Sequence, residues 1–301
     1  MIGTLRTQEI NAQARTGPAD SGHLVVFDDG LFTFAAATSS TAAQLMDART
    51  VDDGSALQFL REKRIRERIS THPGVVVQFA DTAFSHVVLG SCAFATRYPP
   101  PTPNAPVADR LADAVLTFAL AHEYGHVILR HVDLDQPPSA GPAERHAEEL
   151  AADRVGADIC RTALKGSHWA IAGACLFLSG VLALDGLAVL FQTGRLTIPP
   201  SESHPPADAR IANLLDWLAN APGVPAEYAR QLGRAIAYAI YQLAAEVAPA
   251  FERAQRAGYP PAGFRPATEL EQHAALMSFI APLGLGALEP TTRIRPPGAN
   301  R

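Results

Sequence analysis

Cysteine is scarce in this 301-residue chain, which has only Cys92, Cys160 and Cys175. The count is odd and no pair has the CxxC spacing, so neither a disulfide framework nor a cysteine-ligated zinc site is expected. The opening run, MIGTLRTQEINAQARTG, lacks the apolar stretch of a secretory signal. These absences lead us to expect a reducing, cytoplasmic location, with membrane association as the alternative.

An excess of basic residues is also missing. The chain has 25 Lys and Arg against 30 Asp and Glu, for a net charge of -5, so no nucleic-acid partner is expected. The one dense basic run, Arg61 to Arg68, is interrupted by Glu62 and Glu67, which is typical of a solvated helix face. With 48% hydrophobic and 18% charged residues, the composition argues against disorder and fits a globular protein.

The hydrophobic patterning predicts an α+β fold that is mostly helical, with a small sheet near the N-terminus. Two β-type runs flank the turn signal Asp28-Asp29-Gly30 within residues 23–38. Residues 75–79 and 83–95 are rich in β-branched and aromatic side chains and are also predicted as strands. Helices are predicted at residues 41–70, 109–131, 143–164, 206–219 and 225–257, each with approximate ends.

The strongest chemical signal is His122-Glu123-Tyr124-Gly125-His126, inside the predicted helix of residues 109–131. Positions i and i+4 share a helical face, so the two imidazoles can converge on one Zn²⁺ ion. Glu123 is one step round the helix, where it can take a proton from a metal-activated water and pass it to the leaving amine. We therefore predict His122 and His126 as metal ligands and Glu123 as the catalytic base. The competing interpretation is two surface histidines beside a solvated glutamate.

A catalytic zinc needs a third protein ligand and an open position. Leu129 and Val132 occupy the places where a metzincin has glycine and histidine, so that class is excluded. The run AERHAEELAADRVGAD supplies Glu149, followed at i+4 by Asp153, whose carboxylate can accept the second N–H of a ligand histidine. Glu149 is the predicted third ligand. Other nearby groups are either expected to be solvated, as for Glu144 and Glu148, or stay open as rival ligands, as for His131 and His146.

Two segments, LAHEYGHVILRH and EELAADRVGAD, resemble the paired helices of the HtpX-type zinc metallopeptidases, gluzincins that include the CAAX prenyl endopeptidases and Oma-type proteases. Residues 122–126 correspond to that family's HExxH and residues 149–153 to its ExxAD. INAQARTGPADSGHLVVFDDGL resembles its Asn-Ala segment and the strand that follows, although Gln13-Ala14 replaces the usual aromatic. SHPPADARI resembles its His-Pro-Pro segment. The four motifs cover about residues 10–215 in the family's order, and the chain from about residue 221 has no counterpart.

The resemblance implies a zincin-like core, one zinc ion per chain, and endoproteolysis of protein or peptide substrates. It also places the segment of His204 beside the active site, where the prolines that follow hold the loop extended and the imidazole can donate to the oxyanion. The alternative is that His204 is a helix-entry residue with no catalytic part. Arg210 then either assists His204 or supports Glu149 or Asp153. The strand near Val25 is expected either to be an edge onto which an extended substrate pairs or to be an ordinary core strand.

Residues 169–191 are almost wholly apolar and long enough to span a bilayer. One span would carry Glu149 and His204 about 30 Å apart, so a buried helical hairpin with its bend near Asp185-Gly186 is preferred to a membrane span.

The sequence thus predicts a zinc metallopeptidase catalytic domain at residues 1–220 and a helical extension with a disordered tail at 221–301. The predicted function is that of a zinc-dependent endopeptidase. Three alternatives stay open: a non-catalytic binding or regulatory protein on the same fold, an integral-membrane zinc peptidase, and a zinc hydrolase of a non-peptide amide.

Overall fold

The structure is a computed structural model. It describes residues 2–5, 9–17, 22–46, 61–96, 98, 102–132, 141–164, 167–196, 198, 201–221, 225–260, 266 and 268–284. Within this part of the chain the fold is mostly helical with one small sheet, as the hydrophobic patterning predicts.

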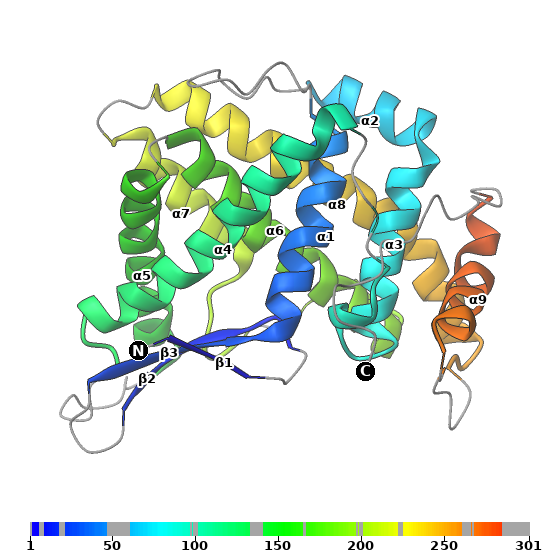
Figure 1. Ribbon diagram of the computed structural model, residues 1–301, viewed down its shortest axis with the longest axis horizontal. Coiled ribbons are helices and arrows are strands. Elements are labelled where there is room, and N and C mark those ends of the chain that lie inside the picture. Colours follow the sequence, from blue (N-terminus) through cyan, green and yellow to red (C-terminus); the bar gives the residue numbers. More distant parts are fainter. Residues whose placement is uncertain are drawn as a thin grey trace.

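The sheet has three strands in the order β1-β3-β2, where β1 is Ile2–Leu5, β2 is Ala12–Thr16 and β3 is His23–Asp28. The central strand β3 pairs in parallel with β1 and antiparallel with β2. β3 is therefore not an edge strand, and the prediction of a substrate-pairing edge near Val25 is wrong for that strand. The sheet lies across the lower ends of two helices, α1 (Asp29–Gln44) and α4 (Ala105–Ile128) (Figure 1).

Seven further α-helices complete the described fold: α2 Glu62–Thr71, α3 Pro73–Val87, α5 Pro142–Ala163, α6 Ser167–Thr193, α7 Ala207–Ala219, α8 Ala226–Arg256 and α9 Glu269–Ile280. Short 3₁₀ turns occur at Cys92–Phe94, Thr102–Asn104 and Ala281–Leu283. The predicted helices near 109–131, 143–164, 206–219 and 225–257 are confirmed. The predicted helix at 41–70 is seen only as the end of α1 and as α2, because residues 47–60 lie outside the described part.

The strands predicted at residues 75–79 and 83–95 are wrong, since residues 73–87 form α3. Pro73 is in the first turn of α3, a position where its fixed φ suits a helix. Val75, Val76 and Phe79 are buried on α3, so tertiary packing outweighs their preference for strands. The prediction of a second strand after Asp28-Asp29-Gly30 is also wrong, because the chain passes from β3 directly into α1 without a hairpin turn.

Residues 169–191 lie in one continuous helix, α6, so the predicted hairpin with a bend at Asp185-Gly186 is wrong. Its 27 residues extend about 40 Å at 1.5 Å per residue. The stretch His168–Thr193 has a mean hydropathy of 2.2, long and apolar enough for a membrane span, yet 61% of its most apolar window is buried inside the protein. Helices α4, α5, α7 and α8 all pack on α6, which runs through the middle of the molecule (Figure 1).

The apolar core is shared by helices from both ends of the chain. Buried side chains of α8, such as Leu232, Ile240 and Phe251, belong to the same cluster as Phe34 of α1 and Phe118 of α4. The division at residue 220 into a catalytic domain and an extension stays a prediction. The tail from Arg293, predicted to be disordered, lies outside the described residues.

Candidate metal centre

The two histidines of the HExxH run lie on one face of α4, near its C-terminal end. Their Nε2 atoms are 3.2 Å apart, and the rings meet edge to face with centroids 4.8 Å apart. His122 is buried beside the ring of Phe118, which limits its motion. The i, i+4 spacing therefore brings both imidazoles to one point, as the sequence predicts.

Helix α5 approaches α4 closely because small residues face each other where the two helices meet. A β-carbon on Gly125 would lie 2.8 Å from the carbonyl oxygen of Ala152. A β-carbon on Gly156 would lie 2.9 Å from the backbone nitrogen of His122. Both glycines are thus needed for the close approach, and the buried face of α5 that includes Ala152 and Gly156 also carries Glu149 and Asp153. The sequence analysis did not identify this contact, although the small residues Ala152 and Gly156, at i+3 and i+7 from Glu149, are its signature.

Glu149 completes a triangle with the two histidines. Its Oε1 lies 3.2 Å from His126 Nε2, and its Oε2 lies 3.4 Å from His122 Nε2. Ligands about 2.05 Å from a tetrahedral metal are about 3.3 Å from one another. Each carboxylate oxygen approaches one imidazole nitrogen at about this separation, so the three side chains can converge on one metal ion. Glu149 Oε2 is buried, and its polar contacts are long ones, with His122 at 3.4 Å, Arg210 at 3.5 Å and His204 at 3.7 Å, so a cation could bind it more closely. These three side chains are the one group in the described chain whose donors all lie within 4.8 Å of one another.

A buried network supports the triangle from behind. Asp153 Oδ1 lies 3.0 Å from His122 Nδ1. Arg210 donates two hydrogen bonds to Asp153, from Nε to Oδ2 at 2.8 Å and from Nη2 to Oδ1 at 2.7 Å. Arg210 Nη2 also lies 3.5 Å from Glu149 Oε2. Both side chains named from sequence as supporting residues, Asp153 and Arg210, are thus brought to the back of the cluster.

The charges of this network shift the pKa values of its members. Burial alone would lower the pKa of His122, but hydrogen bonds with Asp153 and Glu149 outweigh it and raise that pKa to about 9. Burial would raise the pKa of Glu149, but hydrogen bonds from His122 and His126 hold it well below its ordinary value. The pKa of Asp153 is lowered in the same way, with the Arg210 hydrogen bond overcoming burial. The shifts share one direction, with a lowered pKa at the two carboxyls and a raised pKa at His122, so this cluster favours positive charge.

Glu123 projects beside the triangle, toward the sheet. Its Oε2 accepts a 2.7 Å hydrogen bond from the backbone N–H of Ala14 in β2. Burial is the main cause of the raised pKa of Glu123, opposed by the nearby His122 and His126. The sequence analysis did not identify Ala14, because a main-chain donor leaves no residue signature.

His131 and His146, the rival ligands, do not join the triangle. His131 Nδ1 instead lies 3.0 Å from His126 Nδ1, on the side of that ring away from Glu149. His146 Nε2 lies 2.9 Å from the carbonyl oxygen of Ser201. Glu144 and Glu148 are also outside the triangle.

His204 reaches the cluster from the loop that precedes α7. Its Nε2 lies 3.7 Å from Glu149 Oε2, while more than half of the side chain stays exposed. Its Nδ1 is 2.8 Å from Ser203 Oγ. The loop is held to the first turn of α5 by His146 and by Arg145, whose Nε donates to the Glu202 carbonyl oxygen at 2.9 Å. The chain after α6 therefore returns to the cluster, so that His204 lies near Glu149. The sequence analysis had argued that one long helix would keep these two residues about 30 Å apart, and that argument is wrong.

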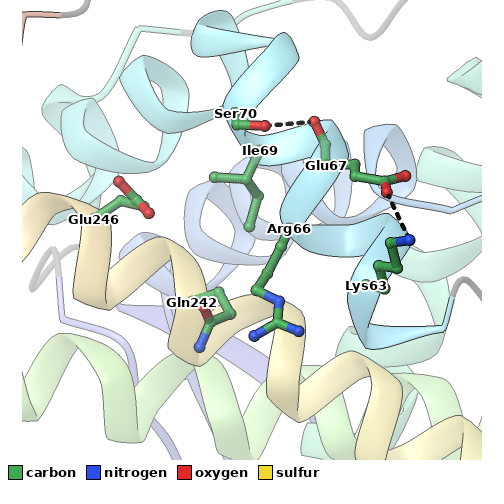
Figure 2. Close-up of a pocket in the computed structure, with 7 residues that line it drawn as sticks. All are labelled: Lys63, Arg66, Glu67, Ile69, Ser70, Gln242 and Glu246. Carbon is green, nitrogen blue, oxygen red and sulfur yellow. Dashed lines mark hydrogen bonds and ion pairs between the residues drawn. The ribbon is translucent and has the colours of Figure 1, made fainter.

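A surface groove between α2 and α8 lies apart from this cluster. It is lined by Lys63, Arg66, Glu67, Ile69, Ser70, Gln242 and Glu246 (Figure 2). Both charge signs are present, and Lys63 pairs with Glu67 at 3.9 Å. None of the residues of the metal triangle lines it.

The fold and the cluster together define a helical protein with a candidate metal-binding triad of two histidines and one glutamate. A family model described as Peptidase U49 matches residues 79–232, which cover α4, α5, α6 and α7 and hence the triad. The chain therefore belongs to the Peptidase U49 family. No curated protein and no solved structure matches it. The finding supports the peptidase class expected from the sequence, while the narrower resemblance to the HtpX type stays a prediction.

Proposed function

We propose that this protein is a zinc-dependent endopeptidase with one zinc ion per chain, held by His122, His126 and Glu149. The observation that carries the proposal is the convergence of two imidazole nitrogens and one carboxylate. His122 Nε2 and His126 Nε2 lie 3.2 Å apart, Glu149 Oε1 lies 3.2 Å from His126 Nε2, and Glu149 Oε2 lies 3.4 Å from His122 Nε2. Two neutral imidazoles and a carboxylate are a ligand set that catalytic zinc sites use, and they leave one coordination position for substrate or water. Membership of a peptidase family supports peptide-bond hydrolysis as the reaction.

Zinc in such a site polarises the scissile carbonyl and lowers the pKa of a coordinated water. Glu123 acts as the general base, takes the proton of the attacking water and delivers it to the leaving nitrogen. Its hydrogen bond from Ala14 N–H orients the carboxylate, and its raised pKa brings it closer to the working pH of such a base.

His204 donates a hydrogen bond to the oxygen on which negative charge develops. In this role the imidazole proton lies on Nε2, the nitrogen nearer to Glu149, and His204 Nδ1 accepts from the Ser203 hydroxyl 2.8 Å away. Burial lowers the pKa of His204, which favours this neutral donor form. Arg210 does not contact substrate in this proposal, because its guanidinium is committed to Asp153 and Glu149.

An extended protein or peptide substrate pairs with β2 rather than with β3. In the antiparallel register the main-chain groups of alternate residues point outward, and the bond from Ala14 N–H to Glu123 places Ala12 and Ala14 in that set. Ala14 N–H stays with Glu123, so the groups left for a substrate strand are the N–H and C=O of Ala12 and the C=O of Ala14. This edge runs beside the catalytic base, so a substrate strand added there would present its backbone to Glu123.

The non-catalytic alternative and the integral-membrane alternative make different predictions from this one. A binding protein has no need of an intact base, whereas Glu123 is present and oriented. A membrane enzyme would need α6 to face lipid, whereas most of its apolar window is packed inside the protein. We therefore propose a cytoplasmic enzyme.

The test is cleavage of an unstructured protein such as casein by the purified chain, with zinc and after treatment with a chelator. We expect chelation to abolish cleavage. Glu123→Gln should keep its zinc and lose about 10²- to 10⁴-fold in kcat, since glutamine cannot carry the proton. Glu246→Gln, in the groove between α2 and α8 and away from the site, is the matched control and should cleave normally. Wild-type turnover by Glu123→Gln would remove Glu123 from the mechanism.

A further inference from the structure

The outer nitrogens of the two triad histidines have different partners. His122 Nδ1 faces the carboxylate of Asp153 at 3.0 Å, and that carboxylate accepts two hydrogen bonds from Arg210. His126 Nδ1 faces another imidazole, that of His131, also at 3.0 Å. The rings of His126 and His131 meet edge to face with centroids 5.1 Å apart, so the contact is directed and not a chance approach.

The backbone at the end of α4 is bent so that His131 turns back onto His126. Arg130 has φ of 63°, the left-handed region that residues with a β-carbon adopt only at a cost. The N–H of His131 donates to the carbonyl of His126 at 2.9 Å, and the N–H of Arg130 donates to the carbonyl of Val127 at 3.0 Å. This pair of bonds is the Schellman ending of a helix, where glycine is the usual residue at the left-handed position.

A hydrogen bond to the sheet holds the residue that follows this turn. The hydroxyl of Thr16, at the end of β2, donates to the carbonyl of Val132 at 2.6 Å. The backbone around His131 is thus held by hydrogen bonds on both sides, two within the end of α4 and one from the Thr16 hydroxyl, and none of them involves a metal. A strained turn that is held this firmly, next to a candidate ligand, indicates a functional demand on the residue that it carries.

We propose that His131 is a positioning residue for the metal centre, which accepts the Nδ1–H of His126 and so fixes the ring and tautomer of that ligand. The proposal rests on the proposed metal function of the triad. A histidine that offers the Nε2 lone pair to a metal carries its proton on Nδ1, and His126 Nε2 is the nitrogen that faces Glu149. His131 must then accept at Nδ1 and carry its own proton on Nε2.

This arrangement gives the two ligands unequal support. The acceptor behind His122 is a carboxylate, and the acceptor behind His126 is a neutral ring, which accepts less strongly. His131 therefore acts mainly by orienting the ring of His126. Another neutral side chain whose acceptor atom lies at the same position should do the same.

The test compares three variants by the dissociation constant of zinc, measured in competition with a chromogenic chelator. His131→Asn keeps an acceptor, because the Oδ1 of asparagine takes nearly the place of Nδ1, and should stay within about threefold of wild type. His131→Leu keeps the bulk without an acceptor and should weaken zinc binding about 10- to 100-fold. Arg130→Gly keeps His131 in a turn that glycine adopts freely and should leave zinc affinity near wild type. Thermal unfolding of the chelated proteins checks that all variants fold alike.

The outcomes separate this role from the metal centre itself. Weak binding by His131→Leu together with rescue by His131→Asn supports the positioning role. Equal affinity in wild type and both variants overturns it and leaves the metal centre intact. Equal weakening in both variants also overturns it, since the ring would then matter for packing and not as an acceptor. A wild-type chain that binds no zinc would reject the metal centre first, and this role with it.

Discussion

Gly156 offers the sharpest test of how the fold builds the metal centre. Its α-carbon packs against the backbone of α4 at His122, and a β-carbon there would lie 2.9 Å from His122 N and 3.0 Å from His122 Cα. Ordinary contacts begin at 3.4 Å, so Gly156→Ala must move α5 away from α4 by roughly 0.5 Å. Backbone atoms on both sides leave no flexible side chain to absorb the shift.

The displacement reaches the proposed metal ligands because Glu149 lies on the same face of α5, two turns before Gly156. Zinc–ligand distances tolerate changes of about 0.2 Å, so a shift of roughly 0.5 Å between Glu149 and the histidines of α4 exceeds that tolerance. We expect Gly156→Ala to weaken zinc binding by at least about tenfold. Overpacking costs about 1–3 kcal/mol and the better helix propensity of alanine returns about 1 kcal/mol, so the chelated protein should lose only about 0–2 kcal/mol of stability.

Gly186→Ala is the matched control, since it is also a glycine within a helix. Its added β-carbon would meet only side-chain atoms of Ile198 and Leu196, at 3.7 and 3.9 Å. It should leave zinc affinity unchanged and raise the free energy of unfolding by about 0.5–1 kcal/mol. Zinc competition and urea unfolding of the chelated proteins measure both quantities. If Gly156→Ala behaves like Gly186→Ala in both assays, the close helix contact does not set the ligand geometry.

Three other predictions concern the site directly. Glu149→Ala should reduce zinc in the purified protein from about one ion per chain to a small fraction, because two imidazoles alone hold zinc weakly; full occupancy by metal analysis would place the third ligand elsewhere. His204→Ala should keep its zinc but lower kcat roughly a hundredfold, and an unchanged kcat would remove His204 from oxyanion stabilisation. The pKa of His122, about 9, lies above its ordinary value of 6.5, so its ion pairs stabilise the metal-free fold fully below about pH 6.5, and this stabilisation is lost as the pH rises through 9. The difference in melting temperature between chelated wild type and His122→Gln should therefore shrink from pH 6 to pH 10, and a constant difference would contradict the assignment.

The sequence predicted that His122, His126 and Glu149 lie together, and they do, because they are on two long helices. Regular helices convert the spacing of His122 and His126, and that of Glu149 and Asp153, into shared faces with little freedom. The proximity of Arg210 and His204 was expected only from the resemblance, since a loop of unknown path joins α6 to α7. The roles of all these residues stay predictions.

The failures of the sequence analysis have two physical causes. The run at 75–79 was predicted as a strand because valine favours strands, but burial in α3 decides its structure, and local propensity is too weak to oppose that. The other features missed were main-chain effects, such as the Ala14 N–H that binds Glu123 and the left-handed turn at Arg130. Such contacts depend on how distant segments meet, which residue spacing does not record.

The central position of α6 has a consequence for the order in which the protein is made. The helix that covers much of it, α8, ends 63 residues after Thr193. At a synthesis rate of about 5–20 residues per second, the ribosome needs about 3–13 s to add that stretch. During this interval the nascent chain exposes an apolar helix of membrane-span length, which only the earlier helices can cover. Early packing against α4 and α5, the two helices that carry the triad, is thus also what protects the growing chain from aggregation.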